Sequence, residues 1–508
     1  MRSLASLATS SLLASVASAQ VVQWDIEKRD NSVPKLTRRA DGTVVEVITN
    51  EKTRGGYFAS CSVGTPAQKI TLQLDTGSSD IWVPASTASV CEPQGQGCTF
   101  GSFDVSASSS AVLVNREFQI SYVDGSSSTG DYINETFAIG DVKLTNMQMG
   151  LGLQTDIAYG LVGVGYDLNE ASQELYANLP IMMVNEGFIN SIAYSLWLND
   201  LGASTGNILF GGIDTDKYTG DLISVDVQPA AQDEFTSFTV LLTSVEGHSS
   251  SGEDALSSSS FPIPVVLDSG TTFSYLPDDL ALQVWTEVGA EYMVVSNDGT
   301  GAPLVPCALA NNNGYVAFGF GGTGGPVIKV GMDELVSPIF TSDVKFTSGT
   351  YKGESICQFG IQNLTVTNSE GTPHFLLGDT FLRSAYVVYD LENNQIGLAN
   401  TDFNATSSNV VPFPSAGAAI PSASAAPSQT DVNSGPTSSP AYNARAGFTD
   451  LSSTGSSSGS SGSGSGGNSS GGDDNAGSLA PALDFTQLIV MGASMGLMMF
   501  GGGMFLLF

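Results

Sequence analysis

Short apolar runs dominate the middle of this chain. From about residue 43 to residue 400, runs rich in Val, Ile, Leu, Phe and Tyr alternate with turns of Gly, Ser, Asn and Asp. Few stretches follow the 3.6-residue period of a helix, so the pattern predicts a mainly antiparallel β fold. Helices are expected only over three short segments, residues 170–179, 280–292 and 332–337.

The first 39 residues are interpreted as processing signals rather than as part of the fold. Residues 1–19 combine a basic start, an apolar stretch and an Ala-Ser-Ala cleavage site, as a secretory signal peptide does. Dibasic pairs at residues 28–29 and 38–39 indicate a propeptide over residues 20–39. The mature chain is therefore expected to begin near Ala40.

The apolar periodicity ends near residue 402, and residues 403–475 are expected to form a stalk. In residues 451–472, Ser and Gly occupy 19 of 22 positions, a composition that cannot bury a core and behaves as a tether. Asn-x-Ser/Thr sequons, which agree with export, begin at Asn134, Asn363, Asn404 and Asn468.

The C-terminus carries an apolar segment, residues 488–508, which is preceded by small residues at 475–477 and a ten-residue spacer. This order is that of a glycosylphosphatidylinositol (GPI) signal, in which the tail is removed and replaced by lipid. The expected attachment site is Asn475, with residues 476–508 removed and with residues 471–474 as alternative sites. A tail-anchored helix is the rival interpretation, although no Lys or Arg follows the segment.

Composition excludes several classes of function. The 50 Asp and Glu residues against 17 Lys and Arg give a net charge of -33, which repels phosphate and excludes a nucleic-acid partner. Two His cannot build a three-histidine metal site, and no His-Glu-x-x-His run occurs, so a metal site of either kind is not expected. Chemistry must rest on carboxylates and hydroxyls. Because the acidic residues ionise together, stability is expected to fall toward neutral pH.

Five Cys in an exported chain predict two disulfides and one remaining thiol. Cys91 and Cys98 enclose a short loop and are expected to pair, which leaves Cys307 with Cys357 by elimination. Cys61 lies in an alternating apolar run, where a buried and inert thiol is expected.

An internal repeat places two acidic loops in matched positions. An apolar strand runs into Asp-Thr-Gly-Ser at Asp75, and 193 residues later another runs into Asp-Ser-Gly-Thr at Asp268. Each half then carries a second apolar-apolar-Gly element, at residues 161–163 and 376–378. Two similar β lobes related by an approximate two-fold axis would bring Asp75 and Asp268 together.

Two carboxyls held this close cannot both ionise easily, so they share one proton and titrate as a coupled pair. A water between them can lose a proton to the ionised carboxylate while the protonated carboxyl polarises a carbonyl, which is general acid-base hydrolysis. Gly77 and Gly270 allow a backbone N–H to approach each carboxylate. The hydroxyls of Thr76 and Ser269 are expected to brace the two loops against each other. Those of Ser78 and Thr271 are expected to donate to the outer carboxylate oxygens.

Several ordered motifs make the chain resemble the pepsin-like aspartic endopeptidases. Residues 57–84 (YFASCSVGTPAQKITLQLDTGSSDIWVP) resemble the first catalytic region of that family, and residues 375–400 (FLLGDTFLRSAYVVYDLENNQIGLAN) its C-terminal signature. Residues 206–220 (GNILFGGIDTDKYTG) are similar to its interlobe region, and the resemblance covers about residues 50–402. The signal, propeptide, stalk and anchor signal make the chain similar to the fungal yapsin-like surface proteases.

The resemblance implies a bilobal β protein over residues 40–402, with one lobe at about 40–220, a second at about 221–402, and a peptide-binding cleft between them. Asp75 and Asp268 match the catalytic pair. Further matches are the flap tyrosine Tyr122, its hydrogen-bonding partner Trp82, and substrate-contacting positions at Gly77, Asp124, Gly125, Gly270, Thr271 and Thr272. The family implies a monomer that acts on polypeptides without a cofactor.

Two positions leave alternatives open. The family usually has Asp-Gly before the first apolar-apolar-Gly element, whereas this chain has Tyr159-Gly160. Asp156 lies three residues earlier, and it is open whether its carboxylate replaces the missing Asp beneath the first catalytic loop. Asp124 either favours Lys or Arg in the substrate, as in yapsin-like proteases, or is a solvated turn residue before Gly125.

Rival functions explain fewer of these features. An inactive binding protein of this family would usually lack a catalytic Asp or the flap Tyr, and this chain keeps all three. A structural cell-wall protein would not need two matched acidic loops, and a two-carboxylate glycosidase has no role for the Gly and hydroxyl after each Asp. The sequence therefore predicts a secreted, surface-anchored aspartic endopeptidase.

Overall fold

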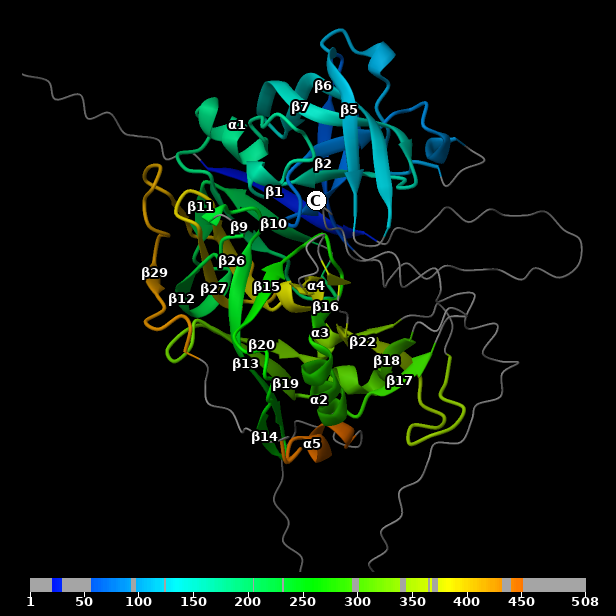
Figure 1. The fold of residues 1–508 in the computed structure, drawn as a ribbon, viewed down its shortest axis with the longest axis vertical. Coiled ribbons are helices and arrows are strands. Elements are labelled where there is room, and N and C mark those ends of the chain that lie inside the picture. Colours follow the sequence, from blue (N-terminus) through cyan, green and yellow to red (C-terminus); the bar gives the residue numbers. More distant parts are fainter. Residues whose placement is uncertain are drawn as a thin grey trace, which may run out of the picture.

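The computed structural model describes most of the chain between the predicted terminal signals. The described residues are 21–29, 56–92, 97–122, 125–203, 205–230, 233–294, 301–338, 344–363, 366–367, 373–431 and 440–450. The predicted signal peptide, the second dibasic pair, the sequon at Asn468, the attachment site Asn475 and the apolar tail lie outside them. Strands predominate and form two lobes (Figure 1), which confirms the predicted mainly β, bilobal fold.

A 14-stranded sheet runs from the N-terminal lobe to strands that the C-terminal half contributes. Its order is β29-β12-β27-β26-β9-β10-β1-β2-β3-β8-β4-β7-β6-β5. These strands are β1 (Val22–Arg29), β2 (Gly56–Val63), β3 (Gln68–Asp75), β4 (Ile81–Pro84), β5 (Val112–Ser121), β6 (Ser127–Ile139), β7 (Val142–Thr155), β8 (Gly160–Gly163), β9 (Ala193–Trp197), β10 (Thr205–Phe210), β12 (Tyr218–Asp226), β26 (Ala385–Asp390), β27 (Gln395–Thr401) and β29 (Ala423–Ala425). A separate pair joins β11 (Gly212–Asp214) to β28 (Val410–Pro412).

Two further sheets build the C-terminal lobe. A nine-stranded sheet has the order β20-β19-β13-β15-β25-β16-β23, with β14 paired to β13 and β24 to β25, and a four-stranded sheet has the order β17-β18-β22-β21. The strands are β13 (Thr239–Ser249), β14 (Gly252–Ala255), β15 (Ile263–Leu267), β16 (Ser274–Leu276), β17 (Glu291–Val294), β18 (Gly301–Pro306), β19 (Tyr315–Phe320), β20 (Val327–Gly331), β21 (Val336–Pro338), β22 (Ile356–Phe359), β23 (Ile361–Asn363), β24 (Val366–Thr367) and β25 (Pro373–Leu377).

The predicted internal repeat appears as two equivalent strand arrangements. In the N-terminal lobe β3 pairs in parallel with β8, and β4 pairs with β8 from the other side in the antiparallel sense. In the C-terminal lobe β15 pairs in parallel with β25, and β16 pairs with β25 in the antiparallel sense. Asp75 is the last residue of β3, and Asp268 directly follows β15. Both acidic loops therefore leave the same kind of strand.

The described helices are α1 (Leu179–Asn185), α2 (Asp278–Val288), α3 (Met332–Leu335), α4 (Asp379–Leu382) and α5 (Arg445–Thr449). The predicted helix at 280–292 is α2, which ends at Gly289 because that residue takes the left-handed conformation (φ 73°). The one at 332–337 is α3, and the chain turns into β21 after Leu335. In the described part of the chain no helix is long and apolar enough to cross a membrane.

The predicted helix over residues 170–179 is wrong. This segment is a loop, and α1 begins only at its end, with Pro180 in the first turn. The backbone N–H of Ala171 donates to Asp80 (2.7 Å), and that of Tyr176 donates to Glu170 (3.0 Å). A helix would pair the N–H of Tyr176 with the carbonyl four residues earlier, whereas here a carboxylate accepts it. Side-chain contacts therefore override the local pattern.

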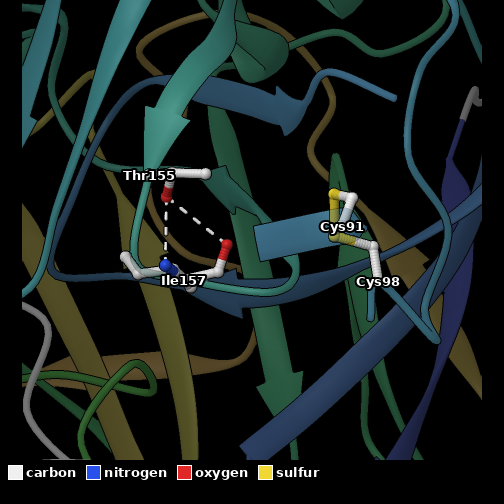
Figure 2. The surroundings of a disulfide bond; sticks show 4 residues. All are labelled: Cys91, Cys98, Thr155 and Ile157. Carbon is white, nitrogen blue, oxygen red and sulfur yellow. Dashed lines mark hydrogen bonds between the residues drawn. A yellow bond between two sulfur atoms is a disulfide. The ribbon is translucent and has the colours of Figure 1, made fainter. Parts of the chain in front are cut away.

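Both predicted disulfides are present, Cys91–Cys98 and Cys307–Cys357. Figure 2 shows the first of them together with the turn that ends β7, where Thr155 Oγ1 accepts a hydrogen bond from the N–H of Ile157 at 3.1 Å. The thiol of Cys61 is buried in β2 and donates to the carbonyl of Ile70. Burial raises the pKa of this thiol, which agrees with the predicted inert role.

Strand β1 lies within the segment predicted to be a propeptide. It pairs with β10 on one side and with β2 on the other, so it is an interior strand of the large sheet. Trp24 and Ile26 are buried in the core, and the Trp24 indole donates to the carbonyl of Ser60 at 3.0 Å. Residues 22–29 are thus an integral part of this form of the protein, which the processing signals alone did not reveal.

The beginning of the predicted stalk also differs from expectation. Residues 403–431 and 440–450 pack against the lobes: β28 pairs with β11, β29 pairs with β12, and α5 lies beside α2 and β13 (Figure 1). We call these residues the C-terminal strap. A few apolar side chains anchor it, since Phe413, Ile420 and Phe448 are buried. The Ser- and Gly-rich run at 451–472 lies outside the described residues.

Candidate active site

The two acidic loops meet at the junction of the lobes and brace each other through reciprocal hydrogen bonds. The N–H of Thr76 donates to Ser269 Oγ (3.2 Å), and the N–H of Ser269 donates to Thr76 Oγ1 (2.9 Å). Each hydroxyl in turn donates across the junction, Thr76 to the carbonyl of Leu267 and Ser269 to that of Leu74. The predicted bracing role of Thr76 and Ser269 matches this geometry, and it fixes one loop relative to the other.

Each carboxylate accepts the same set of hydrogen bonds. Asp75 Oδ1 accepts from the N–H of Gly77 at 2.8 Å, and Asp268 Oδ1 accepts from the N–H of Gly270 at 2.8 Å. The outer oxygen of each receives a hydroxyl, Ser78 Oγ–H on Asp75 and Thr271 Oγ1–H on Asp268. All four predicted donors therefore occupy their expected places.

Gly77 and Gly270 stand where there is no room for a side chain. A Cβ at Gly77 would lie 2.7 Å from Asp268 Oδ1, and a Cβ at Gly270 would lie 2.4 Å from Asp75 Oδ1. A Cβ does not approach a non-bonded oxygen this closely, so any side chain here would push the carboxyls apart. Each glycine lets its loop approach the carboxyl of the opposite lobe.

Both carboxyls are completely buried, and this shapes their protonation. Burial, opposed by the hydrogen bonds from Ser78 and Gly77, raises the pKa of Asp75. Burial together with the negative charge of Asp75 raises the pKa of Asp268 well above its ordinary value. Two such groups bind one proton firmly between them, so the pair carries both an acid and a base at acidic pH.

The flap residues lie beside this pair. The indole N–H of Trp82 donates to the hydroxyl of Tyr122 at 2.7 Å, as the resemblance implied, and both side chains are fully buried. Asp75 is close enough to add to the effect of burial in raising the pKa of Tyr122. Gly125 closes the turn of the β5–β6 hairpin by donating to the carbonyl of Tyr122, with a φ of 83°. Asp124 lies outside the described residues.

A second buried carboxyl cluster lies behind the flap, and the sequence did not reveal it. Asp80, five residues after Asp75, accepts hydrogen bonds from the hydroxyls of Tyr132 on β6 (2.9 Å) and Tyr176 (2.7 Å). Glu170 is beside it and is only 3% exposed. Burial, with help from the charge of Asp80, raises the pKa of Glu170 to about 9. Asp80 thus ties a flap strand to the first catalytic loop while Glu170 stays protonated.

Tyr159, which stands where the family usually has Asp, packs against aromatic rings. Tyr159 makes edge contacts with the rings of Phe58 and Phe100, at centroid separations of 5.4 and 6.2 Å. Asp156 does not fill the place of the missing carboxylate, because its Oδ1 accepts from the N–H of Ser127 at the base of the flap hairpin. Asp156 therefore does not compensate for the missing Asp, and Tyr159 packs against aromatic rings instead.

The protonated state of Glu170 makes stability depend on pH. Its pKa rises from an ordinary 4.5 to about 9 on folding, so the stability that its proton confers is complete below about pH 4.5. That stability is lost as the pH rises toward 9. Glu170→Gln cannot ionise, and we expect it to be more stable than wild type near pH 7, on the order of 2 kcal/mol. Thermal unfolding between pH 4 and 8 measures this difference.

Glu135→Gln is the matched control for this prediction. Glu135 is an equally buried carboxyl on β6, but its oxygens accept hydrogen bonds from Ser108 and Ser110, and it is not part of the cluster behind the flap. Its substitution shows how far the loss of a buried carboxyl on the same lobe changes the melting temperature by itself. Equal pH dependence in wild type and Glu170→Gln would contradict the assignment.

The remaining predicted positions have separate surroundings. The carbonyl of Thr272 accepts a hydrogen bond from the N–H of Thr380 at 3.0 Å. Asn134 is half-buried on β6, Asn363 donates to Asp278, and the exposed Asn404 donates to Asp200. Within the described residues, no group of three or more His, Cys, Asp or Glu side chains is arranged to hold a metal ion.

This paired-aspartate site lies inside a region that matches a known family. Residues 56–401 match the family described as "Eukaryotic aspartyl protease". The chain therefore belongs to the eukaryotic aspartyl protease family.

Its relatives are fungal proteases. The chain is 41% identical over 415 residues to the "Probable aspartic-type endopeptidase opsB" of Aspergillus oryzae. This alignment covers 79% of this chain and 80% of that protein. It is 39% identical over 419 residues to a Trichophyton verrucosum protein of the same description, with 80% and 81% covered. The identity to the "Secreted aspartic protease 3" of Candida albicans is 35% over 372 residues, with 72% and 84% covered. The protein is an aspartic endopeptidase.

Proposed function

We propose that this endopeptidase uses Asp75 and Asp268 as its catalytic pair and activates water by general acid-base chemistry. The observation that carries the proposal is the meeting of two buried carboxyls with matched hydrogen bonds across the lobe junction. The ionised carboxylate removes a proton from the bound water as it attacks, while the protonated carboxyl donates to the carbonyl oxygen of the scissile bond. The proton taken from water then passes to the departing amine.

The flap supplies the rest of the site. Tyr122 is held by Trp82, so the hairpin that carries it has a defined position next to Asp75. A peptide bound between flap and pair would be shielded from bulk water, which strengthens every charge interaction in the site. Backbone groups at Gly77, Gly125 and Gly270, together with Thr271 and Thr272, complete the proposed substrate contacts.

Export and maturation follow from the terminal signals. The signal peptide directs secretion, and cleavage at the dibasic pair 38–39 converts a zymogen into a mature chain that begins near Ala40. Removal of β1 would leave a gap between β2 and β10. The run of residues 43–49 (TVVEVIT) has the composition of a strand and is the segment that we expect to replace it.

Anchoring is proposed from the order of the C-terminal segments. The GPI signal consists of small residues at 475–477, a ten-residue spacer and an apolar tail. The Ser- and Gly-rich run before it separates the anchor from the folded part. The protein then stands on the outer face of the plasma membrane or, after transfer, on the cell wall. Asn134, Asn363, Asn404 and Asn468 are the proposed N-glycosylation sites.

The substrate preference is proposed from one residue. Asp124, placed by the family resemblance at the flap, favours Lys or Arg near the scissile bond through its charge. Purified protein is incubated at pH 3 to 6 with a peptide library, and the cleaved bonds are mapped by mass spectrometry. Asp124→Thr should lower cleavage after Lys or Arg more than after Leu or Phe. An equal loss on both removes the preference, and a correctly processed protein that cleaves no peptide removes the proposed function.

A further inference from the structure

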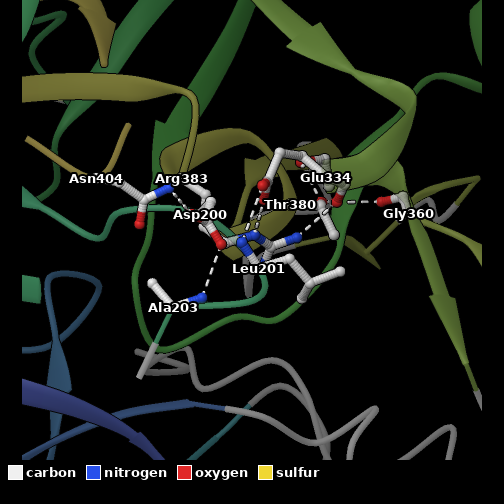
Figure 3. Close-up of polar contacts among 9 residues, drawn as sticks. Asp200, Leu201, Ala203, Glu334, Gly360, Thr380, Arg383 and Asn404 are labelled. Carbon is white, nitrogen blue, oxygen red and sulfur yellow. Dashed lines mark hydrogen bonds and ion pairs between the residues drawn. The ribbon is translucent and has the colours of Figure 1, made fainter. Parts of the chain in front are cut away.

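A buried ion pair lies beneath the C-terminal acidic loop, outside the set of residues that the function uses. Arg383, at the end of α4, and Glu334, in α3, have side chains only 3% and 2% exposed. The Arg383 Nε–H donates to Glu334 Oε2, and its Nη2–H donates to the Glu334 carbonyl at 2.5 Å. Figure 3 shows both side chains together with Thr380 of α4 and the backbone of Gly360. Two hydrogen bonds from one guanidinium thus fix α4 on α3.

The helix that carries Arg383 is bonded directly to the acidic loop. The N–H groups of Asp379 and Thr380 donate to the carbonyls of Thr271 (2.8 Å) and Thr272 (3.0 Å). Thr271 is the residue whose hydroxyl donates to Asp268. A shift of α4 therefore moves the backbone of Thr271 and, with it, the donor on the Asp268 carboxylate.

A second set of contacts surrounds the same helix. Thr380 Oγ1 donates to the carbonyl of Gly360 at 3.0 Å, and the N–H of Gly360 donates to the carbonyl of Leu335 at 2.6 Å. Leu335 is the last residue of α3, next to Glu334. The two helices are therefore connected through Gly360 as well as through the ion pair.

The pair also reaches the large sheet. Glu334 Oε1 accepts the backbone N–H of Leu201 at 2.8 Å, in the loop that follows β9 (Figure 3). The buried Tyr57 of β2 is a neighbour of Arg383, since burial raises the pKa of its phenol while the guanidinium charge opposes that rise. Arg383 and Glu334 thus contact elements of both halves of the molecule behind the site.

Such a pair is a poor source of net stability. Taking two charges out of water costs about as much as their attraction returns, so apolar residues of similar volume can replace a buried ion pair with little loss. Its specific effect is geometric, because a guanidinium bound to a carboxylate and to a carbonyl holds one orientation.

We propose that Glu334 and Arg383 are positioning residues for hydrolysis: they hold α4 so that Thr271 and Thr272 keep Asp268 in its working geometry. This inference rests on the proposed function of the Asp75–Asp268 pair. Neither residue touches the reacting atoms. Their loss should therefore act on the chemical step and leave substrate binding nearly intact.

The test compares single and double substitutions in the full-length protein. Glu334→Met leaves Arg383 buried without its partner and is expected to lower the melting temperature sharply. The double variant Glu334→Met/Arg383→Met removes both charges and should melt at a higher temperature than Glu334→Met. Its kcat on a peptide substrate should still be at least about tenfold lower, with KM within about twofold. A double variant with wild-type stability and wild-type kcat overturns the proposal.

Two further variants keep the result interpretable. Glu334→Gln preserves the volume of the side chain and is used if the double variant does not fold. A lower kcat of Glu334→Gln with unchanged KM supports the proposal. An unchanged kcat overturns it. Glu287→Met is the matched control, since Glu287 is a carboxyl of the same lobe that is 1% exposed and lies on α2. Its kcat should equal that of wild type. Failure of the proposed function itself is recognised separately, because wild type and Asp75→Asn would then be equally inert.

Discussion

Replacing Asp75 or Asp268 with Asn is expected to lower peptide hydrolysis by at least about 10³-fold. An Asn keeps the volume of the side chain and can still accept the N–H of Gly77 or Gly270 on its oxygen. It cannot exchange a proton, so the shared proton and the base that activates water are both lost. The measurement is kcat/KM on a peptide that the wild-type protein cleaves, at its optimal pH.

Stability separates this effect from misfolding. The buried pair of carboxyls costs desolvation free energy, so an Asn at either position should leave the melting temperature equal to or above that of wild type. Asp75→Asn with normal stability and more than about a tenth of wild-type activity would contradict the catalytic assignment.

Ending the chain at Asp402, the boundary expected from sequence, should prevent stable folding. The C-terminal strap buries Phe413, Ile420 and Phe448, and each buried side chain of this size contributes about 2 kcal/mol. Their sum, about 6 kcal/mol, lies within the 5 to 15 kcal/mol that typically holds a domain together. Loss of β29 also uncovers an edge of the 14-stranded sheet, which favours aggregation.

A chain that ends at Asp450 is the matched control for this truncation. It keeps the strap, including the bond from the N–H of Ala444 to Asp254 at 2.8 Å, and lacks only the residues beyond α5. We expect it to melt and to cleave peptides like the full-length protein. Thermal unfolding and soluble yield are measured for both chains, and a chain ending at Asp402 that melts like the longer one would refute the structural role of the strap.

The acidic loops could be predicted from sequence because their chemistry is local. The Gly and hydroxyl after each Asp act within three residues of it, so Asp75 and Asp268 identify their own surroundings. The repeat of an apolar strand before each loop then indicated the two-fold arrangement that joins them. The disulfides could be predicted for a similar reason, since the short loop between Cys91 and Cys98 identifies one pair and, with Cys61 in a strand, leaves Cys307 with Cys357.

Features that depend on distant contacts were not predicted. The helix expected at residues 170–179 is absent, and in its place lies a loop whose first N–H groups include that of Ala171, bound by Asp80 about 90 positions earlier. Glu170 itself gives no local sign of its environment. In the sequence Arg383 is only a basic residue in an apolar run, and nothing there identified Glu334 as its partner.

The strap was missed because composition was averaged over a long segment. Residues 403–431 and 440–450 are rich in Ser, Ala and Pro, and only a few apolar side chains, among them Phe413 and Phe448, anchor them on the lobes. Strand β1 was assigned to a propeptide on its dibasic pair, although its alternating pattern at Trp24 and Ile26 is that of a buried strand. In both cases a processing or tether signal hid a structural role.

The shared proton of Asp75 and Asp268 is the central claim, and the pH dependence of kcat/KM tests it most directly. Activity requires one proton on the pair, since two protons leave no base and none leaves no acid. The profile from pH 2 to 8 should therefore be bell-shaped with its maximum at acidic pH. A profile that rises to a plateau at neutral pH would contradict the account.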